Sequence, residues 1–164
     1  MNRLLRSLVL FVLIGLAAQV SSLRAADLSI TGTAVIPSSS AIQVSATAGE
    51  AITRGQLVYK KTSDRKIYKA DSDSATAEVR DCIGMALTDS SAGGPITYVT
   101  EDPSLAIAAS GLTNGTIYIL SATAGGLAPA ADATTGMFVT VVAVAKSGTT
   151  IAFRATPIRS ATAL

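Results

Sequence analysis

Few side chains in this sequence could carry out catalytic chemistry. The chain has no His, which removes the commonest general base and the His-activated Ser or Cys nucleophile. Cys82 is its single cysteine, so neither an internal disulfide nor a cysteine-rich zinc cluster can form. Its place at the start of an apolar segment predicts a buried, inert thiol. We therefore expect no catalytic, cofactor-binding or metal-binding residue and no small-molecule substrate.

Three carboxylates lie close together in the sequence, at Asp71, Asp73 and Glu78. Clustered carboxylate oxygens are the ligands that Ca²⁺ prefers, but the run lacks the third acidic position and the central Gly of an EF-hand loop. The same acidic and serine residues could cap a short helical turn over 75–78. The turn is favoured, and calcium stays open as the alternative.

The distribution of charge argues against nucleic acid as the main partner. Arg3, Arg6 and Arg24 lie in a leading segment without acids; 13 Lys and Arg less these three leaves 10 against 11 Asp and Glu, a net charge of −1. Nucleic-acid binding requires a positive field to displace counterions. One predicted hairpin nevertheless carries a basic cluster, made of Lys60, Lys61, Arg65, Lys66 and Lys69. The cluster suits a solvated strand edge, with an acidic protein partner or nucleic acid as alternatives.

The elements that must position these residues are predicted to be strands. Hydrophobic residues make up 49% of the chain but aromatic residues only 4%, so Val, Ile, Leu and Ala must build the core. Short segments of strand-forming residues alternate with turn residues at intervals of about ten positions. About ten short strands are expected, over 56–60, 66–70, 82–88, 96–100, 116–120, 137–145 and 149–155 among others. The pattern predicts an all-β fold, a compact β-barrel or β-sandwich.

A degenerate internal duplication covers about 51–100 and 111–155, with 105–109 expected as the link between the copies. Gly55–Tyr59 aligns with Gly115–Ile119, and Ile83–Ala86 aligns with Val142–Ala145, at a spacing of about 60 residues. Asn114-Gly115 is a typical tight-turn dipeptide. The repeat predicts two similar halves related by a pseudo-twofold axis.

The chain divides into four segments. Residues 1–26 place two arginines ahead of the apolar run Leu8–Ala18, which is typical of a secretory signal peptide; an uncleaved anchor and an artefactual upstream extension are the alternatives. Residues 27–48 are expected to form an extended arm and a first strand, with alternation at Ile42 and Val44 predicting half-burial. Residues 49–156 form the β body, and 157–164 are a polar tail.

From Ala26 onward the chain carries a series of turn and strand motifs: Ala26–Thr31, Ala48–Tyr59, Ala70-Asp71, Ala75–Ala77, Ile83–Leu87 and Leu120–Pro129. In these motifs, across nearly all of the body, it resembles a family of small proteins encoded in the structural-gene regions of tailed bacteriophages and prophages. The resemblance implies a non-enzymatic virion protein, above all a capsid decoration protein on the outside of the head shell. It also implies the major capsid protein as partner and a homo-oligomer, with a trimer favoured.

Other functions stay open beside this one. A phage tail or fibre component is one, and a secreted or surface-anchored bacterial β-domain, exported to the periplasm or beyond, is another that the leading segment favours. A carboxylate-only enzyme such as a glycosidase would need paired acids flanking a sugar-sized cleft, and the acids here are few and lie in turns. In the virion role, we expect the arm of residues 27–40 to add a strand to a neighbour's sheet edge.

Overall fold

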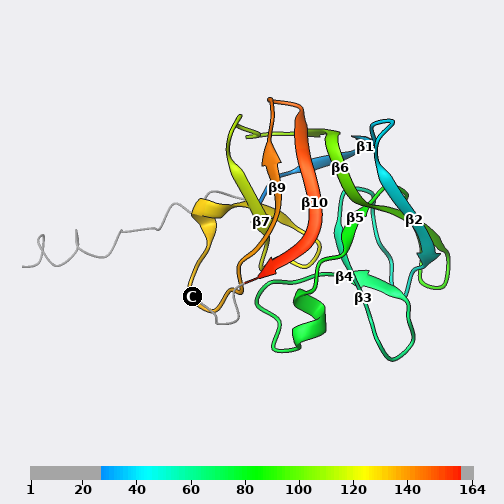
Figure 1. Ribbon diagram of the computed structural model, residues 1–164. Helices are drawn as coiled ribbons and strands as arrows, with labels where there is room; N and C mark the ends of the chain where they lie inside the picture. Colours follow the sequence, from blue (N-terminus) through cyan, green and yellow to red (C-terminus); the bar gives the residue numbers. More distant parts are fainter. Residues whose placement is uncertain (1–26, 160–164) are drawn as a thin grey trace, which may run out of the picture.

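Strands and turns account for nearly all of the structure, a computed structural model that describes residues 27–159. Residues 1–26 and 160–164, and with them the signal-peptide and anchor predictions, lie outside the described residues. Ten antiparallel strands form one curled sheet with the shape of a half-barrel, as Figure 1 shows. The prediction of an all-β fold is confirmed.

The strands lie close to the expected segments but most are shorter. They are β1 (Ile30–Ile36), β2 (Ile42–Thr47), β3 (Leu57–Lys60), β4 (Ile67–Lys69), β5 (Gly84–Ala86), β6 (Pro95–Ala109), β7 (Ile117–Leu120), β8 (Leu127–Pro129), β9 (Thr140–Ala145) and β10 (Thr150–Arg159). Two 3-10 turns, η1 (Ala77–Arg80) and η2 (Ala130–Asp132), complete the set. The expected helical turn is η1, but its N-cap is Thr76, which makes no side-chain capping bond. The nearby acids therefore do not cap it.

The order of strands in the sheet is a palindrome of two repeats. The order is β4-β3-β5-β6-β10-β9-β7-β8, so β3 to β6, the first repeat, mirrors β7 to β10, the second repeat, across the β6–β10 pair. The register agrees as well: Tyr59 faces Tyr68 in the first repeat, and Ile119 faces Ala128 in the second, each 60 positions later (59 to 119, 68 to 128). The internal duplication is thus confirmed in the topology.

The same glycine turn opens both repeats. The N–H of Gly55 donates to the carbonyl oxygen of Ala86, and that of Gly115 donates to Ala145, both at 2.8 Å. Both glycines have a positive φ, 92° and 79°, which a residue with a Cβ adopts only at a cost. The tight turn predicted at Asn114-Gly115 is therefore present, and it has a counterpart in the first repeat.

Strand β6 corrects the expected link at 105–109. It runs for 15 residues and pairs with β2 and β5 over its first part and with β10 and β1 over its second. Pro103, in the middle of the strand, lies exposed where the β6–β10 register shifts, a position that tolerates the missing N–H. Leu105 and Ile107 beyond it are fully buried. β10 likewise continues past the expected end of the body at 156, to Arg159, so the first residues of the predicted tail are strand.

The segment expected as an extended arm is bound to its own chain. β1 pairs antiparallel with the end of β6, and Val35 is completely buried in the main core. The turn after β1 is held by Asp102, a buried carboxylate that accepts hydrogen bonds from the N–H and hydroxyl of Ser38 at 2.7 and 2.6 Å and from the N–H of Ser104 at 2.8 Å. Residues 30–38 are therefore attached to the body of their own chain, and they would have to leave β6 before they could reach a neighbour as a detached arm.

The two repeats do not share the core symmetrically. The main hydrophobic cluster combines Leu57 and Tyr59 of β3 with Tyr118 and Leu120 of β7, which lie on opposite faces of their equivalent strands. A second cluster fills the interior of the first repeat, and a third, around Ile119, covers part of the outer face of the second. The outer face of the first repeat is therefore buried against the second, whereas the equivalent face of the second repeat is partly left open.

Candidate interaction surfaces

The three carboxylates considered for calcium do not meet around a common point. The N–H of Asp73 donates to Asp71 at 3.2 Å, while Glu78 accepts two bonds from Thr62, at 3.0 and 2.7 Å. Over residues 27–159, no group of three or more His, Cys, Asp or Glu side chains is placed to hold a metal ion. Partial burial, followed by the hydrogen bond with Asp73, raises the pKa of Asp71 to about 6. These residues form a hydrogen-bonded turn.

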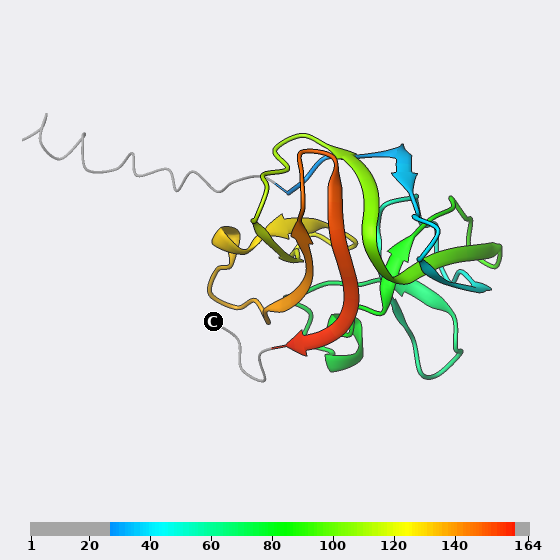
Figure 2. The same cartoon turned by 45° about the horizontal axis from the view of Figure 1, so that its top comes forward.

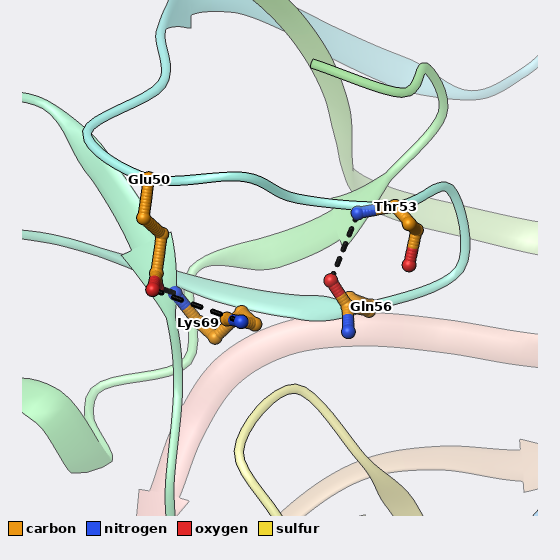
Figure 3. Close-up of polar contacts among 4 residues, drawn as sticks. All are labelled: Glu50, Thr53, Gln56 and Lys69. Carbon is orange, nitrogen blue, oxygen red and sulfur yellow. Dashed lines mark hydrogen bonds and ion pairs between the residues drawn. The ribbon is translucent and has the colours of Figure 1, made fainter. Parts of the chain in front are cut away.

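The basic cluster lies on the β3–β4 hairpin and is interleaved with acids. Lys69 forms an ion pair with Glu50, with 3.7 Å between Nζ and Oε2, and its N–H donates to the same carboxylate at 2.7 Å (Figure 3). At the tip, Asp64 accepts the hydroxyl hydrogen of Tyr68 at 2.7 Å, and the ammonium of Lys61 lies 5.3 Å from the Tyr68 ring centre. Such pairing lowers the net positive field of the hairpin and suits the solvated-edge interpretation.

A second contact in Figure 3 fixes the turn that leads into the first repeat. The side-chain oxygen of Gln56 accepts a hydrogen bond from the N–H of Thr53 at 2.9 Å, across the Arg54-Gly55 turn. This bond and the Glu50–Lys69 pair are structural, because each joins neighbouring segments of one loop-and-strand unit. Cys82 is also structural: it is completely buried, as expected, and desolvation raises its pKa to about 12.

Strand β2 was expected to be half-buried, and it is exposed on both faces. It pairs with β6 along one edge only, and Figures 1 and 2 both place it at the outside of the molecule. Ile42 and Val44 are 55% and 38% exposed, although they alternate as core residues do. The alternation correctly predicted a strand but not its burial, because burial of this face needs a covering layer that residues 27–159 do not supply.

A second apolar surface lies on the outer face of the second repeat. Ile117 of β7 and Val144 of β9 face each other across the strands and are 46% and 40% exposed. Beside them an open groove of about 490 Å³ is lined by Glu101, Pro103, Val141 to Val144 and Ala152 to Arg154. A pair of charges borders the groove, with 3.8 Å between Arg154 Nε and Glu101 Oε2.

Sequence reasoning did not single out either apolar surface. In β7 and β9 the strand-forming residues predicted burial equally on both faces, so no signal separated the exposed Ile117 from the buried Tyr118. For β2 a signal did exist: residues 41–48 contain no charged side chain, although exposed edges commonly carry one.

Over residues 27–159, the structure thus brings the candidate residues together in hydrogen-bonded turns and in two exposed apolar surfaces. In that range there is no helix long and apolar enough to cross a membrane. No protein-family model matches the chain, and a search of curated proteins finds no significant relative.

Proposed function

We propose that this chain is a non-enzymatic structural protein of a bacteriophage virion, a capsid decoration protein that binds the outside of the head shell. The resemblance of its turn and strand motifs to small virion proteins of tailed phages suggests the class. The observation that carries the proposal is the exposed apolar face of the second repeat, around Ile117 and Val144. The major capsid protein is the partner that we assign to this face.

Comparison of the two repeats supports the choice of this face as the binding surface. In the first repeat the equivalent cross-strand pair is Leu57 and Met85, and both side chains are completely buried. The second repeat keeps apolar residues at the same positions without a covering layer. Covering them on a shell would remove apolar area from water at a gain of about 25 cal/mol per Å². Repetition of that contact over a symmetric shell would stabilise the assembly.

The first test is the protein content of purified phage-like particles from the source. Quantitative mass spectrometry should find peptides of this chain at a stoichiometry comparable to that of the major capsid protein. Recovery of the chain from the envelope or medium, with none in particles, would refute the proposal and support an exported β-domain.

The second test locates the binding face. Particles lacking the chain are incubated with purified protein and sedimented. Wild-type chain should bind, whereas Val144→Glu should lose at least tenfold in affinity, because a carboxylate would be desolvated against an apolar surface. Ser63→Glu, at the exposed tip of the β3–β4 hairpin, is the matched control and should bind normally. Equal binding by both variants would exclude this face.

A further inference from the structure

We propose that β2 pairs with β2 of a second copy of this chain, in an antiparallel ladder centred on Val44. Two sheets would then continue into one another across a twofold axis. The interface is separate from the face around Val144, so the inference goes beyond the proposed function and does not depend on it.

The free edge of β2 is formed by its odd-numbered residues. Ala48 exchanges hydrogen bonds with the turn that precedes β6, donating to the carbonyl of Gly94 at 2.9 Å and accepting from the N–H of Gly93 at 2.7 Å. On β6 itself, Thr97 bonds toward β5, since its carbonyl accepts from Leu87 at 2.8 Å. Because main-chain groups alternate in direction along an antiparallel strand, the even residues of β2 face β6. The N–H and C=O groups of Gln43 and Ser45 therefore point away from the sheet. The end of β2 is bordered by β4 on the same edge, since Ala48 is bridged to Ile67 and the N–H of Gly49 donates to the carbonyl of Ile67 at 2.8 Å.

The two strands at the ends of the main strand order, β4 and β8, are covered or charged. β4 carries Lys69 and is bridged at Ile67 by Ala48 of the same chain. β8 ends in Pro129, and the carbonyl of Leu127 already accepts the N–H of Leu28 at 2.8 Å. Over residues 42–46, β2 has neither protection, because this segment is uncharged, lacks proline and has a named pairing along one edge only. An edge of this kind is a template for another strand.

The sequence of β2 is complementary to itself in the antiparallel direction. Centring the pairing on Val44 places Val44 beside its copy, Ile42 beside Ala46, and Gln43 beside Ser45. Apolar side chains thus meet apolar side chains on one face, and hydrogen-bonding side chains meet on the other. Gln43 and Ser45 also form the hydrogen-bonded pair, which matches the outward direction of their main-chain groups. No like charges oppose one another anywhere along the ladder.

Pairing would also extend an existing core. On the face that carries Ile42 and Val44, Ala46 packs against the second hydrophobic cluster, and Val44 lies opposite the buried Tyr98 of β6. A second copy of β2 would add its own Ile42 and Val44 to this row. The exposure of these two side chains, unexplained in the single chain, would then decrease on both sides of the axis.

Cysteine cross-linking of the full chain tests the register. In the proposed ladder the two Val44 residues form a non-hydrogen-bonded pair with Cα atoms about 4.5 Å apart, within reach of a disulfide. Val44→Cys should therefore give a covalent dimer under a mild oxidant. Thr47→Cys, about 20 Å from its copy at roughly 3.3 Å per residue, should remain monomeric on a non-reducing gel. Cys82 is buried and does not compete. Cross-linking of Thr47→Cys and not of Val44→Cys would overturn the register.

A proline at Ser45 tests the pairing itself. The N–H of Ser45 points away from β6, so Ser45→Pro removes a bond of the proposed interface and none of the intrachain ladder. Ser45→Ala is the matched control, since both variants lose the hydroxyl contact with Thr97 at 3.3 Å. Light scattering should show that the wild type and Ser45→Ala are dimers and that Ser45→Pro is a monomer. Circular dichroism should show that Ser45→Pro is folded. A monomeric wild type, or a threefold assembly that Ser45→Pro leaves intact, would refute the proposal.

Discussion

The two repeats place one cross-strand pair in opposite environments. Leu57 and Met85 of the first repeat are completely buried, and Ile117 and Val144, their equivalents in the second, are 46% and 40% exposed. The backbone pairing is the same in both. What differs is the covering layer, because the β7–β8 turn packs on the first repeat and its Gly125 carbonyl accepts the N–H of Leu57 at 2.9 Å. A duplicated fold thus leaves its second copy with an apolar face that its first copy buries.

The hairpin turns of the two repeats differ in the same sense. Arg65 and Gly125 occupy equivalent positions and both have a positive φ, 60° and 78°. In the first repeat the turn is charged and faces water, so an arginine is tolerated there. In the second the turn is packed: a Cβ on Gly125 would lie 3.1 Å from the Cβ of Gln56. Similar backbones were therefore adapted to solvent in one repeat and to the interior in the other.

The largest expected effect compares the two apolar pairs. Leu57→Ala should lower the free energy of unfolding by about 2–5 kcal/mol, because it leaves a cavity in the main core. Ile117→Ala should cost about 1 kcal/mol or less, since roughly half of the side chain is already in water. Urea unfolding of both variants measures the difference. Equal losses at the two positions would mean that the second repeat is covered in the isolated chain as well.

An intermediate effect is expected from substitutions at the two equivalent hairpin positions, Arg65 and Gly125. Gly125→Ala should destabilise the fold by about 1–2 kcal/mol, because a Cβ is strained at positive φ and crowds Gln56. Arg65→Gly should instead stabilise it, by at most about 1 kcal/mol, since relief of strain is partly offset by the entropy of glycine in the unfolded chain. Thermal unfolding of both variants is the measurement, and shifts of the same sign would contradict the assignment of solvent and interior turns.

The smallest effect concerns the pH dependence of stability, through Asp71 of the first repeat. The pKa of Asp71 is raised from 3.8 to about 6, so the folded state binds this proton more tightly than the unfolded state. The stability that the protonated Asp71 carboxyl contributes is fully present below pH 3.8 and is lost as the pH rises through about 6. Asp71→Asn retains an oxygen acceptor and has no carboxyl to ionise.

Melting temperatures of the two proteins between pH 3 and 8 check this sign. The advantage of Asp71→Asn over the wild type should be smallest below pH 4, grow up to about pH 6 and remain constant above it. A difference that shrinks as the pH rises would show that the carboxylate is stabilised by folding, contrary to its partial burial beside Asp73.

The secondary structure and the repeat could be predicted from the sequence because they depend on local chemistry. Strand-forming segments, the glycine turn at Asn114-Gly115 and the 60-residue spacing all leave a pattern in neighbouring residues. The errors arose where that pattern was ambiguous. Proline commonly ends a strand, yet a register shift accommodates Pro103 in the middle of β6. The arm lacked any local sign of its attachment, since its partner Asp102 is 64 positions from Ser38.

The amino-acid sequence by itself determined the all-β class, the duplication, the inert cysteine and the scarcity of side chains suited to catalysis. Only the tertiary structure decided which apolar faces are covered. Alternation of Ile42 and Val44 establishes that two side chains share a face, but the covering of that face depends on segments that are distant in the chain. The same reason separates Leu57 from Ile117: their local sequences are alike, and the packing of a remote turn buries one and exposes the other.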